Sequence, residues 1–123
     1  MSGRPFYQVV AGMLAQEPEQ RVFRSDLRGF QDFFYQQKRT GNPVLTEVRF
    51  GDYFGPVSRE VVGGFLLLNA YGGISVDFPR FDLCRVNPEV VKNIQEESIR
   101  SRTFTQVELP FFPRLAREFF ERF

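Results

Sequence analysis

Residues that could perform acid–base or metal chemistry are few in this chain and are scattered along the sequence. Histidine is absent, and Glu96-Glu97 is the one adjacent pair of acidic residues. Neighbouring residues on a helix point about 100° apart, so these two carboxylates cannot clamp one metal ion. Asp77 and Asp82 flank a predicted turn, where a surface turn is a simpler interpretation than an acid–base pair. We therefore expect no convergent set of carboxylates.

Cys84 is the single cysteine. One cysteine cannot form a disulfide within the chain, and the lack of histidine also excludes Cys/His zinc sites. Ser-His-Asp and Cys-His catalysis lack their usual general base for the same reason. Because Cys84 stands among apolar neighbours in an alternating segment, we expect a buried structural thiol rather than a reactive one.

Two glycine pairs, Gly63-Gly64 and Gly72-Gly73, do not form a phosphate-binding loop. The sequence contains neither a Gly-x-x-x-x-Gly-Lys-Ser/Thr motif nor a Gly-x-Gly-x-x-Gly motif after a strand. The expectation is therefore a protein without a metal, nucleotide or other cofactor, and catalysis ranks third among the functions considered.

The length and composition are those of one globular domain spanning residues 1–123. Apolar residues make up 42% of the chain and charged residues 25%, which is ordinary for such a domain. No apolar run approaches the roughly 18 residues of a membrane-spanning helix. The first ten residues lack the charged-then-apolar layout of a signal peptide, so the sequence predicts a cytoplasmic protein without a membrane partner.

Apolar residues recur with helical periodicity in five segments. Cap and proline signals support their starts, as at Asn87-Pro88. The predicted helices are Arg4 to Gln16, Ser25 or Asp26 to about Lys38, Gly55-Pro56 to Tyr71, Pro88 to about Arg100, and Pro113 to Phe123.

Alternation of apolar and polar residues predicts short strands. These are Val44–Phe50, Ile74–Phe78, Phe81–Cys84 and Thr103–Leu109. The middle two form a hairpin around Pro79-Arg80, and Val44–Phe50 is expected beside it as a short first strand. A helix followed by a two-stranded wing is the second half of a winged helix-turn-helix. The predicted fold is α+β, with a winged-helix-like core of three helices plus a β-hairpin and additional N- and C-terminal helices.

Phenylalanine is in excess, with 16 Phe and no Trp. Several occur as pairs, including Phe33-Phe34 and Phe119-Phe120, and one helix face cannot bury both members of a pair equally. Either the helix is deeply buried, or the second ring meets a partner. The second alternative gives the predicted partner-binding residues: Phe33, Phe34, Tyr35, Phe112, Phe119, Phe120 and Phe123.

The basic residues suggest a second function. All but Lys38 and Lys92 are arginine, which suits bidentate contacts to phosphate or guanine, although an arginine-favouring codon usage would give the same skew. In a winged helix the second helix enters the major groove with its N-terminal residues. The predicted DNA contacts are Lys38, Arg39, Ser58, Arg59 and, at the wing tip, Arg80. A net charge of +1 implies weak binding by one copy, and plain surface charge is an equally simple interpretation.

Residues 40–86 resemble a known family. Tyr53-Phe54-Gly55-Pro56-Val57-Ser58, an apolar helix and then Tyr71-Gly72-Gly73-Ile74 follow the turn Thr40-Gly41-Asn42-Pro43. This pattern is similar to the Tyr-Gly-Pro-x-Ser segment of Panacea-type antitoxin domains, and to winged-helix modules in which a glycine break leads into the wing. The resemblance implies a non-catalytic protein that neutralises or scaffolds a partner and sometimes also binds DNA.

The sequence thus favours a small non-enzymatic bacterial or phage accessory protein that acts by protein–protein interaction. It would be antitoxin-like or a subunit of a larger complex, with another protein or further copies of itself as the partner. The alternative is a winged-helix transcriptional regulator that binds DNA.

Overall fold

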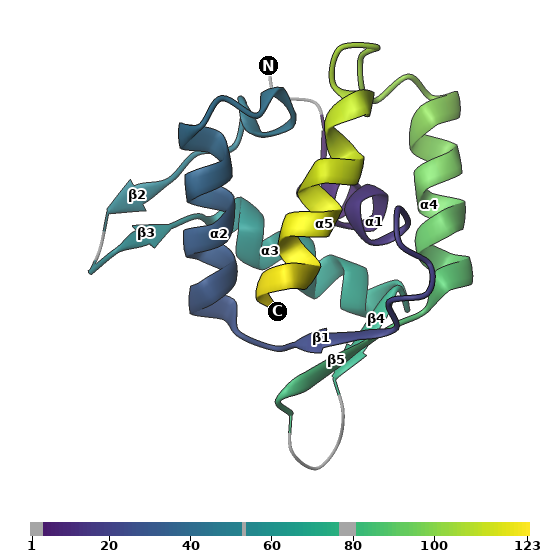
Figure 1. Cartoon of the computed structure of the whole chain (residues 1–123), viewed down its shortest axis with the longest axis horizontal. Coiled ribbons are helices and arrows are strands. Elements are labelled where there is room, and N and C mark those ends of the chain that lie inside the picture. The colour runs from purple at the N-terminus through teal and green to yellow at the C-terminus, as the bar shows by residue number, and fades with distance from the viewer. Residues whose placement is uncertain (1–3, 53, 77–80) are drawn as a thin grey trace.

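The computed structural model describes residues 4–52, 54–76 and 81–123. These residues form an α+β fold with five α-helices, two short 3₁₀ helices and two small antiparallel sheets (Figure 1). In chain order the elements are α1 (Phe6–Leu14), β1 (Val22–Arg24), α2 (Leu27–Arg39), η1 (Pro43–Leu45), β2 (Gly51–Asp52), β3 (Pro56–Val57), α3 (Arg59–Ala70), β4 (Ile74–Val76), β5 (Leu83–Val86), α4 (Pro88–Arg100), η2 (Leu109–Phe111) and α5 (Phe112–Arg122).

Helix α1 is the centre of the fold. All of its residues except Tyr7 and Gln8 are buried, because α3, α4 and α5 all pack against it. A Cβ placed at Gly12 would lie 3.0 Å from Cε1 of Phe112. Glycine at this position therefore allows the start of α5 to approach α1 closely.

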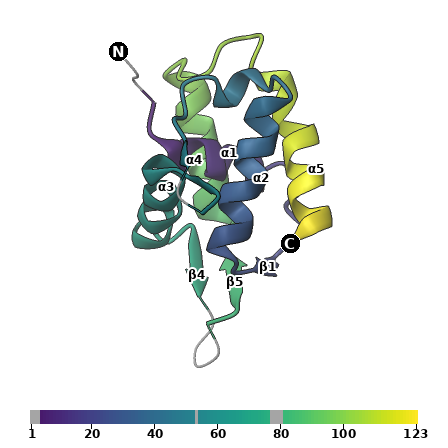
Figure 2. The same cartoon turned by 90° about the vertical axis from the view of Figure 1, so that its left-hand side faces the viewer.

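The larger sheet has the strand order β1-β5-β4. The predicted hairpin is confirmed, since Ile74 pairs with Val86 and Val76 with Cys84. Its turn, with Asp77, Pro79 and Arg80, lies outside the described residues. Phe23 pairs with Cys84 on the other side of β5, and both side chains are buried against the helices. Figure 2 shows the β4–β5 hairpin extending away from the helical body.

Two predicted strands are wrong. The first is Val44–Phe50, because the place beside the hairpin is taken by β1. Pro43–Leu45 forms a 3₁₀ helix, and only Gly51–Asp52, after the predicted segment, is a strand. The Asn42 side chain starts this 3₁₀ turn by accepting a hydrogen bond from the Val44 N–H at 3.0 Å. The second error is Thr103–Leu109, which forms turns leading into η2.

A reciprocal pair of hydrogen bonds explains the turn at Thr105. The Thr105 N–H donates to Oε1 of Glu108 at 2.7 Å, and the Glu108 N–H donates to Oγ1 of Thr105 at 3.2 Å. A side chain that satisfies local backbone groups in this way competes with strand pairing, whatever the apolar alternation indicates.

Helix α5 lies beside α2 and in front of α1, with its C-terminal end near β1, and closes the aromatic core (Figure 1). The ring of Phe119 lies 5.2 Å from that of Phe23, 5.6 Å from Phe30 and 5.5 Å from Phe33. After α5, the Phe123 carbonyl accepts a hydrogen bond from the Arg24 N–H at 3.0 Å. The end of the chain is thus fixed to β1.

Candidate interaction site

The phenylalanine-rich helices do not form the expected contact surface. Phe33, Phe34, Phe112 and Phe119 are buried, and Tyr35, Phe120 and Phe123 are partly buried. Both rings of the Phe119-Phe120 pair have aromatic neighbours, because the ring of Phe120 also lies 6.3 Å from that of Phe23. The first alternative, a deeply buried helix, therefore accounts for these four buried rings. Their assignment to a partner surface is wrong.

Ser58 is not exposed for contact with DNA. The residue is only 1% exposed, and its Oγ accepts a hydrogen bond from the Val61 N–H at 3.3 Å as the N-cap of α3. Its backbone N–H donates to Oε1 of Gln31 at 2.8 Å, and its carbonyl accepts from Nε2 of Gln31 at 3.2 Å. The helix predicted from Gly55-Pro56 therefore begins later, after the short strand β3.

The remaining basic candidates do not all reach the surface. Lys38 is partly buried, and its Nζ donates to the backbone carbonyl of Val48. Arg39 and Arg59 are exposed, whereas Arg80 lies outside the described residues. Within the described part of the chain, two of the five candidates are thus left as freely exposed positive charges.

Helix α3 instead carries an exposed apolar surface. Its inner side consists of Val61, Gly64, Phe65 and Leu68. The sequence from Val61 to Val76 contains no charged residue, so the outer side of the helix has no charge beyond its first turn. We call this surface the α3 face, and it consists of Val62, Gly63, Leu66, Leu67, Ala70 and Tyr71, with the polar Asn69 exposed beside them.

Exposure on the α3 face is large. Leu66 is 64% exposed, Leu67 is 43% exposed and Tyr71 is 54% exposed. A single exposed leucine is normal on a globular protein. Several neighbouring apolar side chains on one helix are characteristic of a contact surface, because their burial by a partner is favourable.

The two glycines of α3 have different surroundings. A Cβ at Gly64 would lie 2.5 Å from Cδ2 of Phe6, so this glycine allows α1 and α3 to pack closely. A Cβ at Gly63 would have no heavy atom of the described residues within 4 Å outside its own helix backbone and chain neighbours. Packing within the described chain therefore explains Gly64 but not Gly63.

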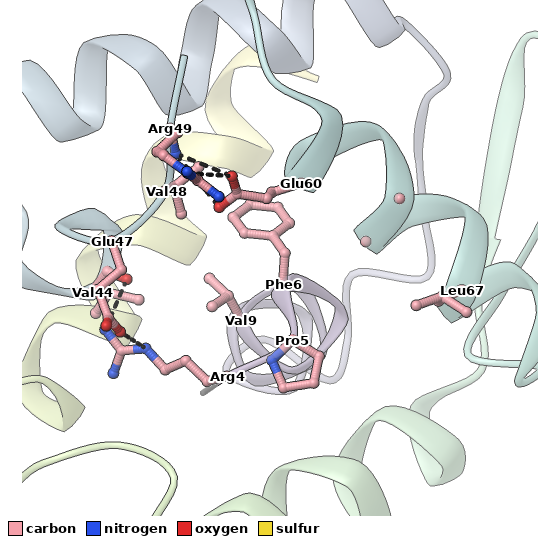
Figure 3. Close-up of a pocket in the computed structure, with 12 residues that line it drawn as sticks. Arg4, Pro5, Phe6, Val9, Val44, Glu47, Val48, Arg49, Glu60 and Leu67 are labelled. Carbon is pink, nitrogen blue, oxygen red and sulfur yellow. Dashed lines mark hydrogen bonds and ion pairs between the residues drawn. The ribbon is translucent and has the colours of Figure 1, made fainter. Parts of the chain in front are cut away.

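A cavity of about 390 Å³ borders the α3 face. It lies between three parts of the chain: the start of α1, the segment that follows η1, and α3. Phe6 and Val9 line it between two pairs of charged side chains (Figure 3). Gly63 and Leu67 form part of its wall on the α3 side. Its size is within the range of sites that accept an apolar group.

Ion pairs flank this cavity. Arg49 Nε lies 3.7 Å from Oε1 of Glu60 on one side, and Arg4 Nε lies 3.5 Å from Oε2 of Glu47 on the other (Figure 3). Arg4 is further held by Glu108, with Nη2 2.5 Å from Oε2. The start of α1 is thus tied to two other segments.

The pKa of Glu108 is lower than that of an ordinary glutamate. Burial raises this pKa, but the hydrogen bonds from Arg4 and from Thr105 lower it by more, because they favour the charged carboxylate. The carboxylate therefore stays ionised next to the Arg4 guanidinium, which also lies 5.1 Å over the Phe104 ring.

Comparison with known proteins finds no relative. No protein-family model matches the chain, and searches of curated proteins and of solved structures also give no match. Two further findings concern the described residues. No helix among them is long and apolar enough to cross a bilayer, and no three of their acidic or cysteine side chains gather where they could hold a metal ion.

Sequence periodicity did not identify the α3 face. The apolar stripe Val57, Val61, Phe65 and Leu68 correctly predicts the last three as the inner side of the helix, whereas Val57 lies in β3 and is exposed. Leu66 and Leu67 fall outside this stripe. The available signal was the lack of charge between Glu60 and Asp77, because a helix with one solvated side usually carries charge there.

Proposed function

We propose that the core is a winged helix. The order α1-β1-α2-α3 is followed by the β4–β5 hairpin in the position of the wing. A winged helix also has a short first strand beside its hairpin, and β1 occupies that place in the strand order β1-β5-β4. On this proposal, α3 corresponds to the second helix of the helix-turn-helix.

On this scaffold the protein acts by protein–protein contact, as a non-enzymatic accessory protein of antitoxin-like type or as a subunit of a larger complex. The exposed, uncharged α3 face carries this proposal, with Leu66 and Leu67 on its outer side. In a DNA-binding winged helix this position presents polar and basic side chains to base edges and phosphates. Leucine and glycine provide no hydrogen-bond donors or acceptors for that purpose.

DNA binding is the weaker alternative. It would rely on Arg39 and Arg59, which are exposed, and on Arg80. Phosphate contacts supply most of the affinity in DNA complexes, and the uncharged α3 face contributes none.

Affinity capture from cells of the source organism tests the proposal. We expect the wild-type chain to retain a specific protein and Leu66→Glu to lose it, because a buried unpaired charge is costly. Val107→Glu is the matched control, since Val107 is 68% exposed and lies in the turns before η2, outside the α3 face. Circular dichroism verifies that both variants are folded.

Two outcomes would contradict the proposal. One is capture that is unaffected by Leu66→Glu, which would remove the α3 face from the contact. The other is an electrophoretic shift of duplex DNA at moderate salt that Arg39→Ala together with Arg59→Ala abolishes, which would support the DNA-binding alternative.

A further inference from the structure

We propose that the α3 face pairs with the α3 face of a second copy of this chain, with the two helices antiparallel around a two-fold axis. This inference rests on the proposed function, because it assigns an occupant to the same surface. It combines the open space at Gly63, the apolar side chain one turn later at Leu67, and the distribution of charge along α3.

Gly63 supplies the first argument. Glycine inside a helix is less favourable than alanine by about 1 kcal/mol, and packing within the described chain gives no reason for it here. A glycine on an exposed helix surface allows another backbone or a large side chain to approach closely. Gly63 also forms part of the wall of the cavity.

Leu67 supplies the matching group. Residues four apart lie on the same side of a helix, so Gly63 and Leu67 are neighbours on the cavity side of the α3 face. An antiparallel pairing centred between them places Leu67 of each copy over Gly63 of the other. The surface is therefore complementary to itself, as a two-fold interface requires.

The charges of α3 favour the same arrangement. Arg59 and Glu60 stand at its first turn, and its last turns carry no charge. An antiparallel pairing puts this first turn beside the uncharged end of the other copy, near Ala70 and Tyr71. A parallel pairing would instead bring Arg59 against its own copy, and like charges at an interface repel.

The size of this contact sets the expected strength. A 12-residue helix is about 18 Å long at 1.5 Å per residue. A pair of such helices belongs with the small interfaces that bury less than about 1,200 Å² in total, and these are weak or transient. We therefore expect a monomer–dimer equilibrium that depends on protein concentration rather than a permanent dimer.

Cysteine cross-linking of the purified chain tests the geometry. In this register Leu66 lies one residue from the level of the proposed two-fold axis. The two copies of Leu66 therefore flank that axis on the same side of the contact, and Leu66→Cys should form a disulfide-linked dimer under mild oxidation. Val107→Cys is the control, because the two positions are 64% and 68% exposed. The native Cys84 is buried and should not interfere. Equal cross-linking of the two variants would overturn the proposed geometry.

Sedimentation equilibrium over a range of concentrations tests the association itself. We expect the wild type and Val107→Glu to dimerise, and Leu66→Glu to stay monomeric. An equal mixture of Leu66→Glu and Leu66→Arg should restore the dimer, which misfolding of either variant would not allow. A wild type that is monomeric throughout would overturn the inference. If Leu66→Glu nevertheless loses a captured partner, the proposed function stands and the occupant is another protein.

Discussion

Helices α3 and α5 use apolar residues in opposite ways. On α5 the buried side holds Phe112, Leu115, Ala116 and Phe119, and the exposed side is charged. On α3 the buried side includes a glycine, and the exposed side beyond the first turn holds leucines without charge. Helix α5, which has more aromatic residues, therefore directs them into the core, whereas α3 leaves apolar side chains on the surface. The side on which a helix lacks charge is more informative about contacts than its number of apolar residues.

The outer side of α5 is occupied by interactions within the chain. Arg114 Nε lies 2.7 Å from Oε2 of Glu118, one turn away, and Arg122 Nη2 lies 2.9 Å from Oδ2 of Asp32 on α2. Such exposed pairs contribute little stability, about 0–1 kcal/mol each. They keep this side of α5 hydrated, in contrast to the α3 face.

The largest expected effect separates the two helices directly. Phe119→Ala should lower the free energy of unfolding by about 3–5 kcal/mol, because it leaves a cavity among several rings. Leu66→Ala should change it by no more than about 0.5 kcal/mol, since the side chain is mostly exposed. Equilibrium urea unfolding at low protein concentration measures both. Similar losses of unfolding free energy for Phe119→Ala and Leu66→Ala would contradict the assignment of α5 to the core and of the α3 face to the surface.

The two glycines of α3 test its two sides. Gly64→Ala should destabilise the fold by about 1–3 kcal/mol, because the new methyl group overlaps Phe6 in a packed core. Gly63→Ala should be neutral or should stabilise the fold by up to about 1 kcal/mol, since alanine is the better helix former. Thermal unfolding of the two variants compares them. A destabilising Gly63→Ala would show that something in the monomer covers this position.

The start of α3 gives a smaller effect. Ser58→Ala removes the N-cap and should lower stability by about 1 kcal/mol. Arg59→Ala, at the next position, should be close to neutral, because Arg59 is exposed. Chemical unfolding resolves the two values. An Arg59→Ala change as costly as Ser58→Ala would give Arg59 a structural role.

The smallest expected effect concerns acid and the outer side of α5. Hydrogen bonds from Arg114 and Gln37 hold the pKa of Glu118 below its usual value, although burial opposes them. The resulting stabilisation is complete above the usual glutamate pKa of about 4.3 and is lost as pH falls through the lowered pKa. Glu118→Gln should therefore lose less stability than the wild type on acidification.

Unfolding midpoints at neutral and acidic pH check this expectation. Glu121→Gln is the matched control, because Glu121 is exposed on the same helix and should keep the wild-type dependence on pH. An unchanged acid dependence in Glu118→Gln would assign the effect to other carboxylates, of which Glu108 is the strongest candidate because its pKa is also lowered.

Local signals in the sequence predicted most of the fold. The apolar stripe of α1, the cap predicted at Ser25 or Asp26 and the cap at Asn87 correctly give three helices, with Asp26 as the cap in the structure. Alternation around Pro79-Arg80 gives the hairpin. The two wrong strands arose where alternation was the only signal, whereas the early start predicted for α3 came from the proline at Gly55-Pro56, which lies in β3 instead. At Val44–Phe50 and Thr103–Leu109, side chains of Asn42 and Glu108 bond to nearby backbone groups instead.

The candidate site was less predictable, because it depends on which helices cover which. Nothing local distinguishes the buried rings of α5 from exposed ones, since their burial requires β1 and α2, distant in sequence. Leu66 and Leu67 lie outside the periodic stripe of α3, but only the packing of the other helices decides that they stay exposed. Only the missing charge between Glu60 and Asp77 was visible in advance.

The central position of α1 has a consequence for the order of folding. This helix is made first, but the helices that bury it follow much later in the chain, and α5 is the last of them. Its buried residues therefore lack part of their cover until α5 has been synthesised, although α3 and α4 are made before it. Contacts between distant segments also slow folding, because the loops between them must be closed first. The helix at the centre of the fold is thus completely covered only after the last helix has been made.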